Sequence, residues 1–75
     1  MTKFVEKMKR SPRNIRFDEL DRFLRSEGFT AFETGSSHVV YRREDGLRLT
    51  VVRPHGGQKT VHIAAVKQVL EVLEL

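Results

Sequence analysis

The hydrophobic residues of this chain follow a helical period near both ends and a strand period between them, which leaves few folds open. Apolar side chains recur every three or four residues over 17–27 and again over 62–73, as in helices with one buried face. Over 47–52 they alternate with polar side chains, which is typical of a strand with one buried face. The sequence therefore predicts two helices that flank a β region.

The β region divides into three short strands. Residues 29–34 are aromatic and β-branched, 37–43 form a second such run, and Glu44-Asp45-Gly46 predicts a hairpin before the third strand at 47–52. Short connections make neighbouring strands pair antiparallel, and each helix has only one apolar stripe to bury. We therefore predict an α+β fold, helix–three antiparallel strands–helix, with both helices on one sheet face. The other face stays open as a candidate binding surface.

The size of the chain limits how stable this fold can be. Its 75 residues suffice for one domain, and a chain this short buries only about 60% of the surface it exposes when unfolded. It contains no cysteine, so neither a disulfide nor a thiolate zinc site can add stability. We therefore expect a binding partner.

The net charge of +4 is distributed unevenly along the chain. Residues 1–16 hold six cations against one anion, and 38–67 is also basic, whereas 17–37 and 68–75 are acidic. A basic surface favours polyanions such as nucleic acid. The sequence thus predicts two cationic regions rather than a uniform coating.

The first of these regions predicts a basic N-terminal arm over residues 1–14, followed by the domain at 15–75. The arm is either a short amphipathic helix over 3–9, which Ser11-Pro12 must end, or disordered. No stretch approaches the roughly 18 apolar residues of a membrane span, and the start lacks the apolar segment of a secretory signal. We expect a cytoplasmic protein with no membrane contact.

A phosphate-binding loop is the first chemical motif to consider, because HGGQKT lies between a strand and a helix. That motif requires glycine directly before the lysine, where this chain has Gln58. We reject the motif, although Lys59 near a helix start remains a candidate phosphate contact, as well as a plain solvated loop residue.

Serine hydrolase and metal chemistry are also disfavoured. Ser37 and His38 are adjacent on a strand and point to opposite faces, so the histidine cannot take the proton of that serine. His38, His55 and His62 contain no i, i+4 pair and have no nearby carboxylate ligand. We predict no metal and no other cofactor.

His38 is the residue best suited to catalysis. Histidine titrates near neutrality, so it can take a proton from a ribose 2′-hydroxyl or return one to a leaving oxygen. Cations could hold the phosphate and stabilise its developing charge. The candidates in the basic middle of the chain are Arg42, Arg43, Arg53 and Lys59. A strand histidine is more often simply structural, and the residue pattern alone leaves both interpretations open.

Alternation along the second strand places His38, Val40 and Arg42 on one face and Val39, Tyr41 and Arg43 on the other. The pattern does not decide which face is buried. If Val39 and Tyr41 pack inward, then His38 and Arg42 share the open face, with Arg48 and Thr50 of the next strand as further candidates. In that case Tyr41 is a core aromatic with a wet hydroxyl.

Several segments match one protein family in order and spacing. They are Ser-Glu-Gly-Phe (26–29), Gly35-Ser36-Ser37-His38-Val39-Val40-Tyr41, Asp45-Gly46, Leu49-Thr50-Val51, Pro54-His55-Gly56-Gly57 and Val-Lys-Gln-Val-Leu (66–70). Over Ile15 to Leu73 the chain resembles the HicA toxins of bacterial toxin–antitoxin pairs. The second segment corresponds to the family pattern Gly-Ser-His-x-x-Phe/Tyr.

The resemblance implies a fold like that of double-stranded-RNA-binding domains. It implies a metal-independent endoribonuclease, an mRNA interferase, whose catalytic histidine is that of Gly-Ser-His, here His38. It also implies a HicB-like antitoxin as partner, which binds the toxin and masks the histidine. Such antitoxins often carry a DNA-binding segment, so DNA would be contacted only through the antitoxin.

The chain departs from the family pattern at one position. An extra serine places Gly35 one residue farther from His38 than usual, so the turn that presents the histidine differs. Two alternatives to an RNA-cleaving toxin are considered: a non-catalytic RNA- or DNA-binding module of the same fold, and a domain that binds only protein.

Overall fold

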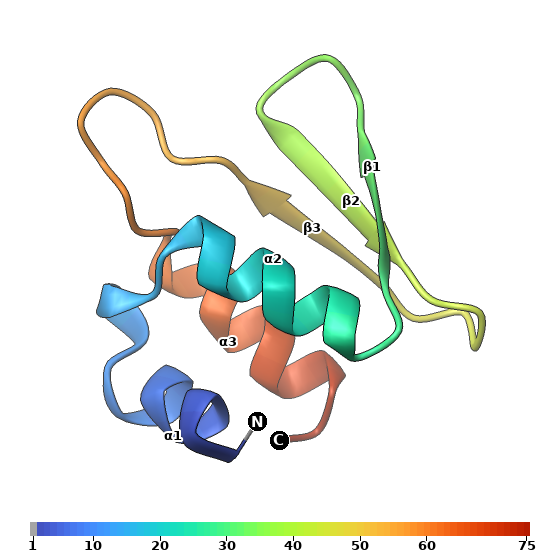
Figure 1. Cartoon of the computed structure of the whole chain (residues 1–75), viewed down its shortest axis with the longest axis horizontal. Helices are drawn as coiled ribbons and strands as arrows, with labels where there is room; N and C mark the ends of the chain where they lie inside the picture. The colour runs from blue at the N-terminus through green and yellow to red at the C-terminus, as the bar shows by residue number, and fades with distance from the viewer. Residues whose placement is uncertain (1) are drawn as a thin grey trace.

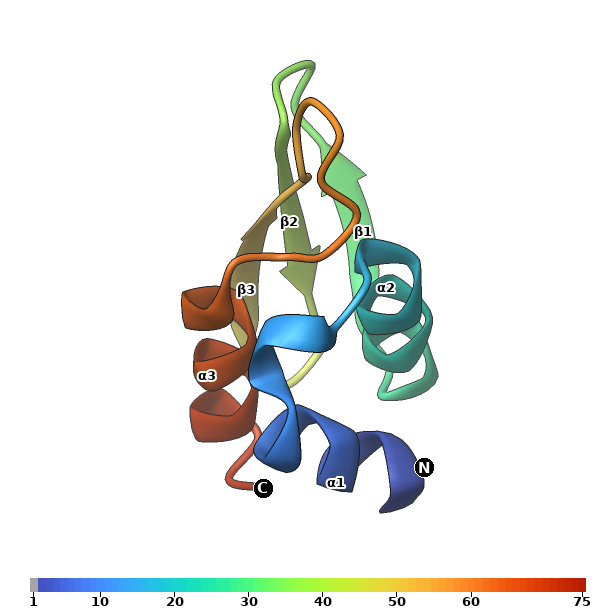
Figure 2. The same ribbon diagram turned by 90° about the vertical axis from the view of Figure 1, so that its left-hand side faces the viewer.

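The computed structural model describes residues 2–75 of the chain. In chain order its elements are α1 (Thr2–Arg10), the 3-10 turn η1 (Pro12–Asn14), α2 (Phe17–Ser26), β1 (Thr30–Glu33), β2 (His38–Arg42), β3 (Arg48–Val52) and α3 (Ile63–Val72). The three strands form one antiparallel sheet in the order β1-β2-β3. Helices α2 and α3 lie on the same side of this sheet (Figures 1 and 2). The predicted α+β fold is confirmed, with element ends within one residue of those expected.

The sheet has one buried face and one open face. The buried face consists of Val39, Tyr41, Leu49 and Val51, each at most 1% exposed. These side chains pack with the stripe residues of the two flanking helices, which include Leu20 and Leu24 of α2 and Val66 and Val69 of α3. The structure thereby decides which face of β2 points inward.

Local signals explain where α2 begins and ends. Asp18 and Glu19 lie in its first turn, where the positive end of the helix dipole favours carboxylates. Gly28 follows the helix with φ of +91°, a conformation that side chains with a Cβ rarely adopt. Its amide donates to the carbonyl of Arg25 at 3.1 Å. The chain can therefore turn sharply from α2 into β1.

The N-terminal segment packs against the rest of the protein. Helix α1 lies on the side of α2 and α3 that is away from the sheet (Figures 1 and 2). Its Met8 is fully buried, and the rings of Phe4 and Phe23 lie 5.1 Å apart between centroids. Lys7 also pairs with Glu19 of α2 at 2.8 Å. The short helix allowed by the sequence is present, whereas a separate basic arm is not confirmed; a domain boundary at residue 14 stays a prediction.

Tyr41 connects the sheet to α2 by a hydrogen bond as well as by packing. The side chain is fully buried, and its hydroxyl donates to Asp21 Oδ1 at 2.7 Å. Asp21 also accepts from Arg25 at 3.0 Å. Burial and then the bond to Asp21 raise the pKa of Tyr41 well above its usual range, although Arg25 and Arg53 oppose the shift.

None of the helices in residues 2–75 is long and apolar enough to cross a bilayer.

The burial of α1 predicts a stability loss for Met8→Ala. Removing a fully buried methionine side chain should lower the free energy of unfolding by about 2–5 kcal/mol, because a cavity remains between α1 and the core. The neighbouring exposed Lys9→Ala change should cost less than about 0.5 kcal/mol. Urea denaturation followed by circular dichroism measures both; equal unfolding midpoints would show that α1 contributes nothing to the core.

The Tyr41–Asp21 bond predicts a loss of stability in alkali. Tyr41 is neutral in both states below about pH 10, the value for an unfolded tyrosine. Above that pH the unfolded chain releases the proton and the folded chain retains it, so stability falls as pH rises. The free energy of unfolding should therefore drop more steeply above pH 10 in the wild type than in Tyr41→Phe.

The same prediction can be checked by absorbance, because Tyr41 is the only tyrosine of the chain. Tyrosinate absorbance should appear together with the loss of circular dichroism. A tyrosinate signal with a midpoint near pH 10 in a protein that is still folded would contradict it.

Candidate functional site

His38 lies at the start of β2, on the open face of the sheet. It is exposed, and its partner across the sheet is Val52 of β3. The turn over 34–37 leads directly into it. The alternation that buries Val39 and Tyr41 thus turns His38 toward solvent.

Two hydroxyl groups of the preceding turn hold the histidine. The backbone N–H of His38 donates to Ser36 Oγ at 3.2 Å, and its ring Nδ1 lies 3.3 Å from the same oxygen. Ser36 Oγ is in turn 3.0 Å from Thr34 Oγ1, which donates to the carbonyl of His38 at 3.4 Å. Thr34, Ser36 and His38 therefore form a closed hydrogen-bonded loop, which we call the hydroxyl loop.

When all four contacts of the hydroxyl loop form at once, they select one tautomer of the His38 ring. The single proton of Thr34 is used toward the His38 carbonyl, so Ser36 must donate to Thr34. The proton of Ser36 is then also used, so the ring must donate from Nδ1 to Ser36. All four contacts exist together only in this arrangement, which leaves a lone pair on Nε2. In residues 2–75 no hydrogen bond to Nε2 is present, so this nitrogen can act as a base.

Unpaired cations occupy the opposite end of the open face. Arg42 and Arg48 face each other across β2 and β3, and neither has a carboxylate partner among the described residues. Two like charges placed directly opposite destabilise a sheet, whereas a bound anion would relieve the repulsion. Arg42 lies about 13 Å along the strand from His38, four residues at roughly 3.3 Å each.

An exposed aromatic ring lies between these two ends. Phe32 of β1 pairs with Val40, so it shares the open face, and it is 48% exposed. The guanidinium carbon of Arg42 lies 6.0 Å from the centre of its ring. Sequence reasoning did not single out Phe32; placing 29–34 in register with β2 would have found it. An apolar ring beside free cations is suited to a nucleic acid base near its phosphate.

Arg43 is directed away from the open face. Its guanidinium donates to Asp45 at 2.8 and 3.0 Å and to the Glu27 carbonyl at 3.1 Å, and lies 5.0 Å from the Phe29 ring centre. The bond to Asp45 raises the pKa of Arg43, and the same bond lowers the pKa of Asp45. The structure thus gives Arg43 a structural role in the hairpin.

The other two predicted cations lie beyond the sheet. Arg53 pairs with Glu33, and its guanidinium carbon lies 4.6 Å from the centre of the Phe17 ring on the helix side. Its backbone, however, adjoins the histidine turn, because its N–H donates to the Ser37 carbonyl at 2.8 Å. Lys59 is exposed on the loop before α3 and has no ion pair among residues 2–75. Of the four cations predicted from the sequence, only Arg42 shares the open face with His38.

Metal-ligating side chains do not gather in the part of the chain that the structure describes. Across residues 2–75 no three histidine or carboxylate side chains lie close enough together to hold an ion.

Comparison with known protein families shows which family the chain belongs to. A family model described as the HicA toxin of bacterial toxin–antitoxin systems matches residues 17–75, which is most of the chain. No curated protein and no solved structure gives a significant match. The match covers α2, the whole sheet, the hydroxyl loop and α3. The chain therefore belongs to the HicA family and is the toxin of a toxin–antitoxin system, for which the family implies a HicB-type antitoxin as partner.

Proposed function

We propose that this toxin is a metal-independent endoribonuclease that cleaves mRNA, with His38 as its one catalytic residue. The observation that carries the proposal is the hydroxyl loop, because it holds an exposed histidine through its backbone N–H and Nδ1 and leaves Nε2 without a hydrogen bond in residues 2–75. Family membership supports the same activity. With mRNA as its substrate, the toxin would act in the cytoplasm.

The proposed reaction is an attack within the RNA chain. Nε2 of His38 takes the proton of a ribose 2′-hydroxyl, and the oxygen forms a bond to the adjacent phosphorus. The bond from phosphorus to the 5′-oxygen of the next nucleotide breaks, and that oxygen takes up the proton from the His38 imidazolium. The products are a 2′,3′-cyclic phosphate and a 5′-hydroxyl.

The remaining side chains of the open face would bind the RNA. Arg42 and Arg48 would attract the phosphates on one side of the scissile bond, and the Phe32 ring offers a surface on which a base can stack. Lys59 would contribute from the loop, whereas the paired guanidinium groups of Arg43 and Arg53 would have to leave their carboxylates first. The four predicted cations would therefore contribute unequally to RNA binding, and Arg48 would be a fifth cation that binds RNA.

The antitoxin would compete with RNA for this surface. We propose that a HicB-type partner covers the face that carries His38 and contacts DNA itself, so that the toxin meets DNA only through its partner. Neutralisation would then need no change in the toxin fold, because covering Nε2 is enough to stop the reaction.

Replacing His38 tests the catalytic role. His38→Ala should slow RNA cleavage by about 100- to 10,000-fold, the usual contribution of a general acid–base group, and should abolish growth arrest on expression. Arg22→Ala, which removes an exposed cation of α2, should leave both unchanged. The measurement is a gel assay with purified protein in the presence of EDTA, with mass spectrometry of the cyclic phosphate end.

Two outcomes of that assay would overturn the proposal. Undiminished cleavage by the alanine variant would exclude His38 as the catalytic residue. RNA binding without cleavage by the wild type would favour the non-catalytic binding module.

The two serines before His38 allow a matched test of the hydroxyl loop. Ser36→Ala removes all three contacts of the Ser36 hydroxyl. Loss of the contact to the His38 ring, worth about 1 kcal/mol, should slow cleavage roughly five-fold. In 15N spectra of the ring it should also change His38 from one tautomer to a mixture. Ser37→Ala should alter neither, since the Ser37 side chain makes no hydrogen bond in residues 2–75. Equal effects of the two changes would show that the loop does not set the tautomer.

A further inference from the structure

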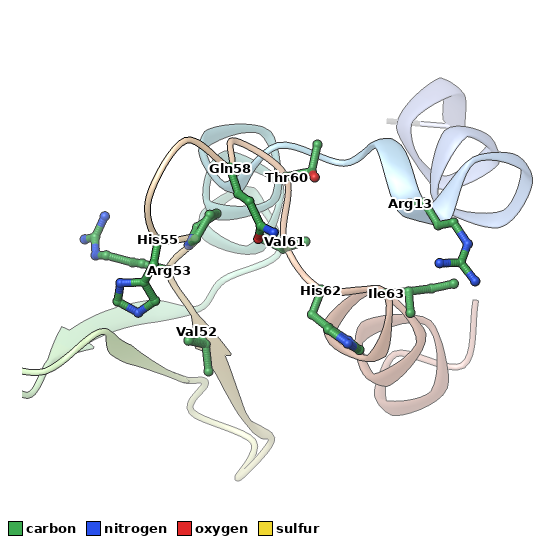
Figure 3. A pocket seen from close by; sticks show the side chains of 10 residues that line it. Arg13, Val52, Arg53, His55, Gln58, Thr60, Val61, His62 and Ile63 are labelled. Atoms are coloured by element: carbon green, nitrogen blue, oxygen red, sulfur yellow. The ribbon is translucent and has the colours of Figure 1, made fainter.

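A hollow of about 460 Å³ opens beside the end of β3, next to the first turn of α3 (Figure 3). Its lining includes Arg13, Val52, Arg53, His55, Gln58 and His62. Its volume is in the range of pockets that hold small ligands, about 300–1,000 Å³. The proposed reaction at His38 does not itself use this hollow.

The hollow adjoins the catalytic histidine. Val52 forms part of its wall and is the direct cross-strand partner of His38, so the two side chains are about 5 Å apart at their Cβ atoms. Both lie on the open face. A strand of RNA with its scissile phosphate at His38 would therefore reach the hollow with the next nucleotide.

The wall of the hollow is held in place by the backbone. The Val61 N–H donates to the Ile15 carbonyl at 2.9 Å, and Thr60 forms a bridge with Arg16. These bonds tie the loop before α3 to the segment before α2. The hollow is thus formed without a ligand, which lowers the cost of binding one.

The lining is suited to a base and its phosphate. It contains two imidazole rings, the amide of Gln58, two arginines and no carboxylate. Arg53 is paired with Glu33, whereas Arg13 has no carboxylate partner among residues 2–75. His62 Nδ1 accepts from the Ala64 N–H at 3.0 Å, so its Nε2–H is left as a donor. By contrast, the hollow of about 370 Å³ between α2 and the sheet is lined by three carboxylates and two arginines. These arginines, Arg25 and Arg53, are paired with Asp21 and Glu33, so they are less available to a phosphate.

We propose that this hollow binds the nucleotide next to the scissile phosphate of a single-stranded RNA. The proposal rests on the function proposed above. Flexible single strands can turn an unstacked base into a pocket, where aromatic rings and amides recognise it. His55 and His62 supply the rings and Gln58 the amide, while Val52 provides apolar contact (Figure 3).

The test uses a probe that the toxin cannot cleave, so that binding is separated from catalysis. The probe is a seven-nucleotide RNA with a 2′-O-methyl group at every ribose, added to the full chain and followed by NMR and fluorescence anisotropy. We expect shifts of the amides of 58–63 together with that of His38. His55→Ala should weaken binding about 5- to 100-fold through lost stacking.

A charge variant with a matched control shows whether the effect is local. Gln58→Glu places a carboxylate in the hollow and should weaken binding about five-fold, as expected for one charge near a phosphate. Asn14→Asp adds the same charge on an exposed amide outside the hollow and should have a much smaller effect. Equal weakening by the two variants would overturn the proposal.

The remaining outcomes separate this proposal from the proposed function. Shifts at His38 and Arg42 but none over 58–63 would overturn the nucleotide site and leave the ribonuclease in place. A failure of the probe to bind, together with a wild type that cleaves no RNA, would overturn both. If His55→Ala and Gln58→Glu weakened binding of the antitoxin but not of the probe, the hollow would be a protein contact and the proposal would be wrong.

Discussion

The two-residue alternation along β2 is the constraint on which both the core and the candidate site depend. It sends Val39 and Tyr41 under the helices and His38 and Arg42 to solvent. A shift of one residue in register would reverse all four, placing a charged arginine in the core and exposing the tyrosine. The burial of Tyr41 and its bond to Asp21 therefore also keep His38, the proposed catalytic residue, on the open face.

The N-terminal helix changes how this small protein reaches stability. A chain of 75 residues without cysteine suggests a core that needs a partner. Instead, α1 adds a layer beneath α2 and α3, and Met8 and Ile15 are both fully buried. Its cations remain on the outer side, with Lys7 held by Glu19. The chain thus supplies part of its core from its own N-terminal helix.

The sequence predicted the elements well because each one carries its own periodic pattern. It could not predict interactions that depend on distant neighbours. Arg43 meets Glu27 across 16 positions and Arg53 meets Glu33 across 20, so two predicted RNA contacts have protein partners instead. The role of His38 was predicted from its chemistry and from the family pattern, and it stays a prediction. The hydroxyl loop was missed, although Thr34 and Ser36 lie four and two positions before it, because their contact requires the turn geometry.

The extra serine before His38 acquires a physical meaning in this turn. With Gly35-Ser36-Ser37 preceding the histidine, it is Ser36 that reaches the ring and the backbone N–H of His38. Ser37 contributes only its carbonyl, which accepts from the backbone of Arg53 and so ties the turn to the end of β3. Ser36 thus orients the His38 ring, and Ser37 connects the turn before His38 to the loop that forms the hollow. The added residue would then lengthen the turn without releasing His38. The turn stays attached on both sides, because Ser36 bonds to His38 and the Ser37 carbonyl accepts from Arg53.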